Sequence, residues 1–287
     1  MSEPSIQTKK KITRRNFLRL SLFAGLASTS ALSYSFFFER LNIEMKQIKI
    51  TSSRVPQSFR GKRIVHISDI HFGFFFDLEE LRELTAEINR IKPDLICFTG
   101  DFIDYEFTKN QATQVSEILK HLKAPLGKFA ILGNHDYWGD VTLVQTCLQE
   151  SGFTLLKNQV TEIKTETDQI YLSGLDDILE GTPDLHPIIQ QTQNHHDRFH
   201  IMLVHEPDYA DAVASYHVDL QLSGHSHGGQ ISFPVIGPLI TPQGSKKYIS
   251  GLYKVNERLN LYTSRGIGTT ILPIRFLCRP ELTVIEL

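Results

Sequence analysis

Short runs of apolar residues recur along the chain from about residue 45, each bounded by glycine or polar residues. Runs of this length that are rich in Val, Ile, Leu and Phe are typical of buried β-strands. The pattern predicts five such strands, over residues 63–68, 94–100, 128–133, 199–205 and 218–224. It also predicts a β-hairpin and three further strands, over residues 159–174, 247–254, 259–263 and 282–286.

Two segments between the first three strands, residues 78–91 and 112–122, have apolar residues at helical spacing. An apolar stripe of this kind predicts a helix that packs one face against a core. The resulting order is strand-helix-strand-helix-strand, then the hairpin, then helix-strand-helix-strand-strand. This order favours an α/β protein with stacked sheets. No repeat, low-complexity tract or linker divides residues 45–287, so we expect a single domain there.

Residues 1–44 differ in character from the rest of the chain. A strongly basic stretch, KKKITRRNFLRL (9–20), leads into SLFAGLASTSALSYSFFF (21–38), which has no charged residue. A basic stretch followed by an uncharged apolar one is typical of an export signal or a membrane anchor. Within it, TRRNFL (13–18) resembles the twin-arginine signal, which is read by a receptor of the export machinery for folded proteins.

We therefore predict export by the twin-arginine route. The protein would then lie at the outer face of the cytoplasmic membrane, in the cell wall or in the periplasm. The alternative is a chain that stays anchored to the cytoplasmic membrane, although the apolar stretch is only marginal for a permanent span, which needs about 20 mostly apolar residues.

The composition is that of an ordinary globular protein. The chain of 287 residues is 41% hydrophobic and 22% charged, with a net charge of −2. A charge so near zero argues against nucleic-acid binding through a broad basic surface, so we expect no nucleic-acid partner. Cys97, Cys147 and Cys278 form no CxxC pair, and we interpret them as small buried apolar residues.

Polar clusters follow each of the five predicted buried strands. In chain order they read SDIHFG, GDFID, GNHDYW, HEPD and GHSHGG. Open α/β sheets gather their ligand sites at the carboxyl ends of the strands. The candidate metal ligands in these clusters are Asp69, His71, Asp101, Asn134, His205, His225 and His227. Because they offer oxygen and imidazole nitrogen but no thiolate, they suit Mn, Zn or Fe, and seven ligands suit two divalent ions that share a bridging carboxylate.

Each candidate also has a simpler interpretation when taken alone. Asp69 is suited to a turn or a helix cap, and His205 to a satisfied core histidine. The spacing argues for the metal interpretation, because residues two apart on an extended segment face the same side. We therefore expect Asp69 with His71, and His225 with His227, on strand ends or turns rather than on helices.

The series D-x-H, G-D, G-N-H-D, H and G-H-x-H resembles the signature of the calcineurin-like binuclear metallophosphoesterases, over about residues 60 to 287. The exported twin-arginine type and related membrane-associated bacterial phosphoesterases are similar in their GHSHGGQ-like block and in a stretch like residues 264–282. The resemblance implies a metallo-dependent phosphatase fold, a four-layer α-β-β-α sandwich of two mixed sheets flanked by helices.

The resemblance also implies a role for each candidate. One metal would be held by Asp69, His71 and His227. The other would be held by Asn134, His205 and His225, with Asp101 bridging the two. His135 would face the substrate and donate a proton to the leaving oxygen or stabilise phosphate charge, with Asp136 orienting it. A hydroxide that bridges the ions would be the nucleophile, because two metals lower the pKa of bound water to about 7.

The substrate is less closely defined. Apolar residues at 72–77 and 231–240 flank the predicted ligands and favour a lipid-linked or membrane-proximal substrate with peripheral membrane contact, although Phe72 and its neighbours could instead pack under the sheet rim. We predict a phosphodiesterase or phosphomonoesterase acting on a cell-envelope or lipid-linked substrate. The alternatives are a membrane-associated pyrophosphatase for a UDP-acylglucosamine on the cytoplasmic face, and a metal-binding protein without turnover.

Six further residues lie near these clusters or near predicted strand ends. Arg265 and Arg275 could contact phosphate, but we expect them to be paired at the surface or in the interior, and the same holds for Arg279. Three acidic residues could support the ligands from behind. These are Asp104, Asp176 and Asp177.

Overall fold

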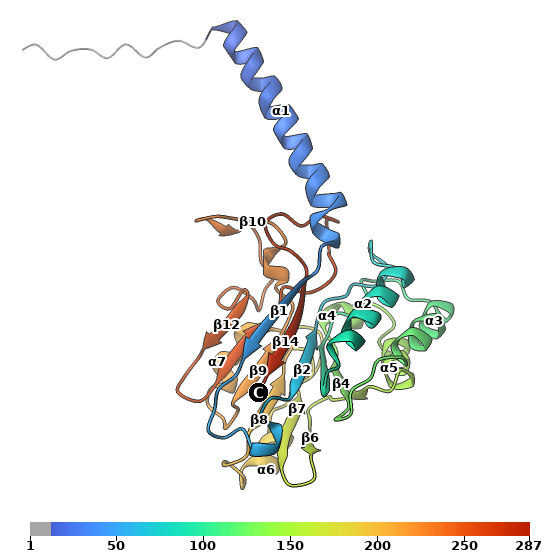
Figure 1. Ribbon diagram of the computed structural model, residues 1–287, viewed down its shortest axis with the longest axis vertical. Helices are drawn as coiled ribbons and strands as arrows, with labels where there is room; N and C mark the ends of the chain where they lie inside the picture. Colours follow the sequence, from blue (N-terminus) through green and yellow to red (C-terminus); the bar gives the residue numbers. More distant parts are fainter. Residues whose placement is uncertain (1–12) are drawn as a thin grey trace, which may run out of the picture.

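Two mixed β-sheets pack face to face in the structure, a computed structural model that describes residues 13–287 (Figure 1). Within these residues each of the two sheets has six strands. The first sheet has the order β1 (Glu44–Lys49), β14 (Glu281–Glu286), β2 (Arg63–Ile67), β3 (Leu95–Thr99), β4 (Lys128–Ile131) and β5 (Thr154–Leu155). The second has the order β12 (Gly251–Lys254), β13 (Asn260–Thr263), β9 (Leu220–Ser223), β8 (His200–Leu203), β7 (Gln169–Gly174) and β6 (Gln159–Lys164).

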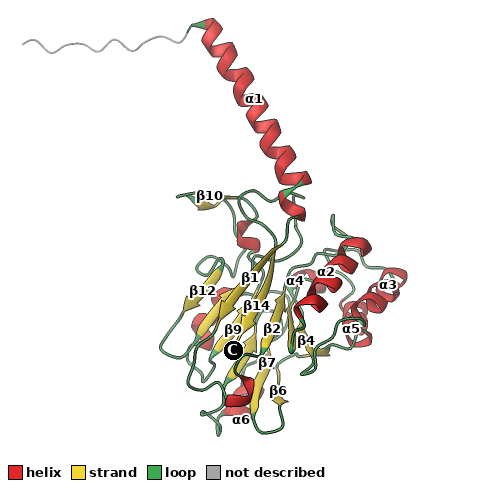
Figure 2. Ribbon diagram, viewed as in Figure 1, coloured by secondary structure: helices red, strands yellow, loops and turns green. Residues whose placement is uncertain are grey.

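Helices cover the outer face of each sheet (Figure 2). The first sheet is covered by α2 (Leu78–Ile91), α3 (Lys109–Leu119) and α5 (Val141–Glu150). The second is covered by α6 (His186–Thr192) and α7 (Ala210–Val213). The predicted α/β sandwich of two mixed sheets flanked by helices is confirmed.

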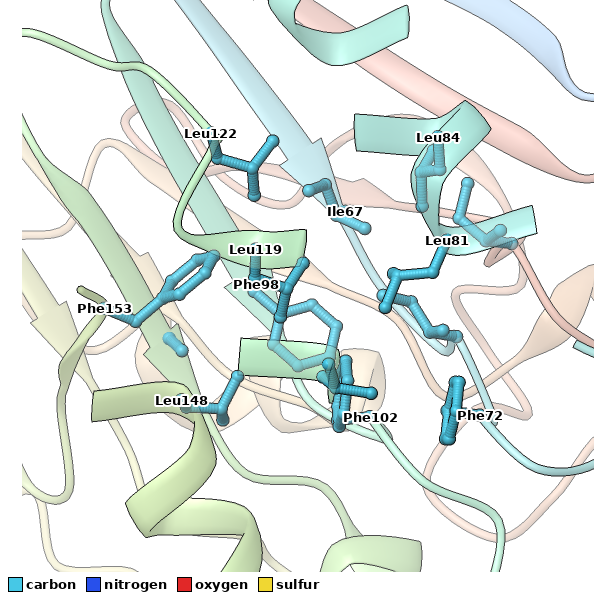
Figure 3. Packing of buried hydrophobic residues seen from close by; sticks show 14 of the residues in the cluster. Ile67, Phe72, Leu81, Leu84, Phe98, Phe102, Leu119, Leu122, Leu148 and Phe153 are labelled. Carbon is cyan, nitrogen blue, oxygen red and sulfur yellow. The ribbon is translucent and has the colours of Figure 1, made fainter. Parts of the chain in front are cut away.

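Alternation along β2 shows how the two sides of the first sheet are filled. Val65 and Ile67 belong to the cluster shared with the covering helices, whereas Ile64 belongs to the cluster between the two sheets. Side chains of successive strand residues point to opposite faces, so one strand serves both cores. Figure 3 shows the first of these cores, where Leu81 and Leu84 of α2 pack near Ile67 and Phe72.

The boundaries of α2 follow from local chemistry. Asp77 accepts hydrogen bonds from the backbone N–H groups of Glu79 and Glu80, and the Glu80 carboxylate accepts one from the N–H of Asp77. This reciprocal capping box satisfies donors that a helix start leaves free. The helix ends at Lys92, whose backbone is left-handed with φ of 54°.

Most predicted elements are present, and the differences are local. The five buried strands and the hairpin lie within the predicted ranges, while the strand expected over 247–254 is confined to residues 251–254. Residues 231–240, expected to be an apolar loop, contain a small hairpin of β10 (Ser232–Phe233) and β11 (Gly237–Pro238). Several other elements among residues 13–287 were not predicted from the pattern, among them β1, β5, α4 (Asn134–Trp138) and α5.

A long helix, α1 (Arg14–Phe37), projects away from the sandwich (Figure 1). Its first turn is capped by Thr13, whose hydroxyl accepts a hydrogen bond from the N–H of Asn16. Together with the short 3-10 turn Glu39–Leu41 it is long and apolar enough to cross a membrane. The first 12 residues of the predicted signal lie outside the described residues.

Candidate metal centre

The seven predicted ligands lie after the ends of β2, β3, β4, β8 and β9, in loops except for Asn134, which begins α4 (Asn134–Trp138), and His227, which begins a 3-10 turn. Their backbone is unusual, because five of them are non-glycine residues with left-handed φ values between 48° and 66°. These are Asp69, His71, Asp101, His225 and His227. Such conformations are costly and concentrate at functional sites. The pairs Asp69–His71 and His225–His227 therefore lie on tight turns, and the idea that the two ligands of a pair face one side because the backbone is extended is wrong.

One group of side chains converges from the β2 and β9 loops. The Nε2 atoms of His71 and His227 are 2.9 Å apart. The Nε2 atom of His227 also lies 3.6 Å from Oδ1 of Asp69. All three side chains are buried, and their ligand atoms are close enough to hold one metal ion.

A second group converges from the β3, β8 and β9 loops. Nε2 of His205 lies 3.2 Å from Oδ2 of Asp101 and 3.2 Å from Nδ1 of His225. The same Asp101 oxygen is 3.6 Å from Nε2 of His71 in the first group, so Asp101 lies between the two groups. The buried Oδ1 of Asn134 has no hydrogen-bond partner among residues 13–287. An orphaned buried oxygen of this kind calls for a ligand.

The hydrogen bonds of the histidines show that these groups fit a cation. Nδ1 of His205 donates to the Thr99 carbonyl at 2.6 Å, and Nε2 of His225 donates to the Gln243 carbonyl at 2.7 Å. The opposite nitrogens of both rings then carry lone pairs, and these point at each other. Nδ1 of His71 is likewise held by Asp104, at 3.2 Å from Oδ1. Metal-binding histidines are oriented in this way, so the residues fit divalent ions.

The electrostatics of the pocket favour positive charge as well. Burial disfavours a charged His205, but the neighbouring Asp101 outweighs it and raises the pKa of His205 well above its usual range. Burial and the charge of His205 lower the pKa of His225 to about 3. The carboxylates thus favour a positive charge at this position, which a metal ion would supply in place of the His205 proton, while His225 stays neutral and available as a ligand.

Two glycines are required by close packing in these loops. A Cβ atom on Gly224 would lie 1.8 Å from Oγ of Ser68 and 2.3 Å from Oδ2 of Asp69. A Cβ atom on Gly133 would lie 2.3 Å from Oδ1 of Asp101. Larger residues at either position would displace a carboxylate of the centre.

His135 stands beside this centre but is oriented differently from the prediction. Its Nδ1 lies 3.0 Å from the carbonyl oxygen of Asp104 and 3.4 Å from that residue's Oδ1. A carbonyl only accepts, so Nδ1 carries a proton and Nε2 is free for a substrate. Burial lowers the pKa of His135, but the hydrogen bond to Asp104 and the charge of Asp101 outweigh it and raise the pKa overall.

The prediction that Asp136 orients His135 is wrong. The Asp136 carboxylate is fully buried and accepts backbone N–H bonds from Gly133, Asp101, Phe102 and Ile103, at 2.8 to 3.2 Å. It therefore joins the β3 loop to the start of α4 (Asn134–Trp138) and holds the loop that carries Asp101. Asp104, considered from the sequence only as a supporting residue, takes the orienting position.

The three arginines are paired within the protein, as expected. Arg265 binds Glu281 and Glu44, and Arg279 binds Asn42. Arg275 is fully buried, and its guanidinium donates to the backbone carbonyls of several residues around the centre, Arg265, Gly266, Gly268 and Cys278 among them. It fixes the loop behind His227 rather than facing a substrate.

The other two acidic residues, Asp176 and Asp177, support loops outside the two ligand groups. Asp176 accepts hydrogen bonds from the Tyr137 hydroxyl and the backbone of Thr182. Asp177 caps its own loop by accepting from the N–H groups of Leu179 and Glu180. Neither is part of the two ligand groups.

Comparison with known proteins identifies the family. The model of the calcineurin-like phosphoesterases matches residues 62–229, which include all five ligand loops. The chain belongs to this family. The phosphoesterase is 41% identical over 286 residues to the uncharacterized metallophosphoesterase YkuE of Bacillus subtilis, covering 97% of this chain and 98% of the relative. It is 30% identical over 279 residues to the phosphodiesterase YaeI of Escherichia coli, covering 96% and 99%.

A solved structure supports the fold. The NAD nucleotidase of Haemophilus influenzae is similar with a TM-score of 0.50 and 12% identity, over 72% of this chain and 45% of that one. The family and its relatives show that the chain is a metal-dependent phosphoester hydrolase. The buried His and Asp groups that the fold brings together are the candidates for its divalent metal centre.

Sequence reasoning missed an aromatic wall beside the phosphoesterase site. The rings of Tyr105 and Trp138 stack with centroids 5.6 Å apart, and the Trp138 ring lies 4.3 Å from that of His135. Both aromatic side chains are about half exposed. In the sequence, this wall is indicated by the doublet YW after GNHD and by the tyrosine directly after Asp104.

Proposed function

We propose that the phosphoesterase binds two divalent ions and hydrolyses phosphodiester or phosphomonoester bonds with water as the nucleophile. One ion would be bound by Asp69, His71 and His227. The other would be bound by Asn134, His205 and His225, with Asp101 shared. The observation that carries this proposal is the pair of facing lone pairs on His205 and His225, together with the position of Asp101 between the two groups.

The chain's own residues prepare the reaction around that centre. Divalent ions supply, when bound, the Lewis acidity that activates water and neutralises phosphate charge. Asp104 fixes the His135 ring through Nδ1, which leaves Nε2 directed away from the protein's own hydrogen bonds. His135 then donates a proton to the leaving oxygen or stabilises phosphate charge. Asp136 keeps the loop with Asp101 in place.

The substrate that fits these surroundings carries an apolar group. Tyr105 and Trp138 form an exposed aromatic wall next to His135, where a leaving group would lie. Apolar residues also follow candidate ligands along the chain, at 72–77 and 231–240. In the first stretch Phe75 is exposed, whereas Phe72 and Phe76 are buried in the core. A cell-envelope or lipid-linked phosphoester is the class of substrate we propose.

A hydrolysis assay tests the proposal. The purified full chain would be given bis-p-nitrophenyl phosphate and p-nitrophenyl phosphate after loading with Mn, Zn or Fe. We expect metal-dependent release of p-nitrophenol that is lost on chelation. His135→Ala should lower turnover while the bound metal measured per chain stays unchanged. Loss of metal together with turnover would contradict the role given to His135.

We also propose that α1 directs the protein to the cell envelope by the twin-arginine route. Its support is the TRRNFL motif at the start of an apolar helix with basic residues before it. A reporter fused after residue 45 should be exported, and changing Arg14 and Arg15 to lysine should abolish export. A reporter that stays on the cytoplasmic face in both forms would favour a membrane-associated pyrophosphatase acting on a nucleotide-linked lipid.

A further inference from the structure

Exposed apolar side chains gather around the base of α1. They come from three loops, residues 72–76, 231–240 and 270–277. Val235 is 106% exposed and Ile271 is 84% exposed, as exposed as side chains in an unfolded chain. The other members of this apolar face are Phe75, Ile236, Leu239, Ile240, Leu272 and Leu277. Single apolar residues on a surface are ordinary, but a contiguous set marks an interaction site.

Hydrogen bonds join two of these loops into one structure. The N–H of Ser232 donates to the Phe276 carbonyl at 3.0 Å, and the Phe233 and Phe276 rings lie 5.7 Å apart. The side chain of Gln230 makes two hydrogen bonds to the backbone of Thr270, both 2.8 Å. The apolar side chains thus sit on a supported platform rather than on independent loops.

The base of α1 is attached to the same platform. Oε1 of buried Glu39 accepts a hydrogen bond of 2.8 Å from the N–H of Cys278. Nη1 of Arg40 donates to the Phe75 carbonyl at 2.6 Å, and the Phe36 and Phe75 rings lie 5.7 Å apart. Figure 1 shows the hairpin labelled β10 beside the point where α1 leaves the domain.

The composition and backbone of the face are unusual for a solvent-exposed surface. Residues 231–240 contain no charged residue, and residues 268–280 contain no acidic one. Val235 and Ile271 have φ values of 73° and 63°, in the region that glycine or asparagine normally occupies. A β-branched residue is costly there. The loops therefore present bulky apolar side chains at positions where a turn alone would favour a small or polar residue.

We propose that the apolar face inserts into the interfacial layer of the bilayer that α1 enters. A helix of 24 residues spans about 36 Å, enough for a hydrocarbon core of about 30 Å. Because α1 is attached to the platform, a bilayer crossed by α1 lies against the exposed loops. Apolar loop tips with no acidic residue can enter the boundary between headgroups and acyl chains, as amphipathic surface segments do.

Docking in this way would place the metal centre at the headgroup layer. Phe75 follows His71 by four residues, and Val235 follows His227 by eight, so two of the loops that enter the lipid begin close in sequence to the candidate ligands. This consequence rests on the proposed hydrolase function, whereas the docking itself does not. A phosphate group carried by a membrane lipid would reach the centre without leaving the bilayer.

Fluorescence from a single labelled position tests the docking. The full chain with Ile236→Cys would carry the environment-sensitive dye NBD and be reconstituted into vesicles of phosphatidylcholine with phosphatidylglycerol. The native cysteines are free but buried, so unmodified protein serves as the labelling control. Glu166→Cys is the matched site, because it is exposed in the turn between β6 and β7 at the opposite end of the domain (Figure 1).

The two positions should behave differently. At residue 236 we expect blue-shifted emission, protection from iodide in water, and quenching by lipids that carry a doxyl group near the headgroup. At residue 166 we expect free access to iodide and no quenching by doxyl lipids. Equal access to iodide at both positions overturns the proposal. Protection at residue 236 without doxyl quenching also overturns it, because it indicates contact with a second protein chain instead.

An activity measurement separates docking from catalysis. The double variant Ile236→Glu with Ile271→Glu should keep its rate on soluble bis-p-nitrophenyl phosphate. Its rate on a phosphoester lipid held in vesicles should fall by about a hundredfold, the effect of losing two buried isoleucines from the bilayer contact at about tenfold each. Doxyl quenching without any hydrolysis would retain the docking and reject the proposed function. An unchanged vesicle rate with both glutamates present would contradict the docking.

Discussion

Replacing Asp136 distinguishes a loop-holding residue from one that orients His135. The Asp136 carboxylate, fully buried in α4, accepts four backbone N–H bonds, three from the loop after β3 and one from Gly133. Asp136→Ala leaves those donors without partners. A buried donor left unsatisfied costs about 1–3 kcal/mol, so even the low end of the range predicts a loss of about 4 kcal/mol in the free energy of unfolding. At about 2–4 °C per kcal/mol, the melting temperature should fall by about 8 °C or more.

The free energy of unfolding of Asp136→Asn should lie between that of Asp136→Ala and that of the natural protein. Its amide oxygen can still accept the bonds from Phe102 and Ile103, which both reach Oδ1. The amide nitrogen would face the N–H groups of Asp101 and Gly133, donor against donor. We expect a loss of about 2 kcal/mol from the two missing bonds.

Thermal and urea unfolding, followed by circular dichroism on metal-free protein, measure these losses. Asp140→Ala is the matched control, because Asp140 is an exposed helix cap that accepts a single N–H bond, from Leu143. Loss of a cap costs about 1 kcal/mol. If Asp136→Ala unfolds no more easily than Asp140→Ala, and instead shifts the pH dependence of turnover, then Asp136 acts on His135 and the structural argument is refuted.

Three other substitutions have distinct expected outcomes. Asp104→Asn removes a charge that raises the pKa of His135, so the ring should lose its proton at lower pH. The alkaline limb of the plot of kcat against pH should therefore move to lower pH. An alkaline limb that does not move would contradict the role given to Asp104. Gly224→Ala brings a Cβ atom into contact with Asp69 and should reduce bound metal per chain, which elemental analysis would show; full metal content would contradict the packing argument. Trp138→Ala should raise KM for aryl phosphodiesters more than it lowers kcat, and a pure kcat effect would count against an aromatic wall.

The sequence predicted the fold and the ligand loops because both depend on local patterns. Short apolar runs identify buried strands, and the polar clusters sit where those strands end. The strand β1 was missed because its residues, EMKQIK, are mostly exposed at the sheet edge. It becomes a strand by pairing with β14, whose residues lie more than 200 positions away, as in the pair Glu44 and Glu281. No local sequence pattern indicates a strand partner that lies so far away along the chain.

The role of Asp136 was missed for a geometric reason. Adjacency in GNHD suggests that His135 and Asp136 act together, but both lie in the short helix α4. Successive residues of a helix point about 100° apart, so the two side chains cannot share a face. The true neighbour, Asp104, lies in the loop after β3 and comes into contact only through the fold. Its signal was weak, a second aspartate three residues after Asp101.

Anomalous diffraction from crystals of the Mn-loaded full chain tests the central claim most directly. We expect two peaks, because the ligand atoms form two groups with Asp101 Oδ2 between them. His227 should coordinate one peak and His225 the other, with Asp101 bridging both. A single peak coordinated by both His225 and His227 would contradict the account.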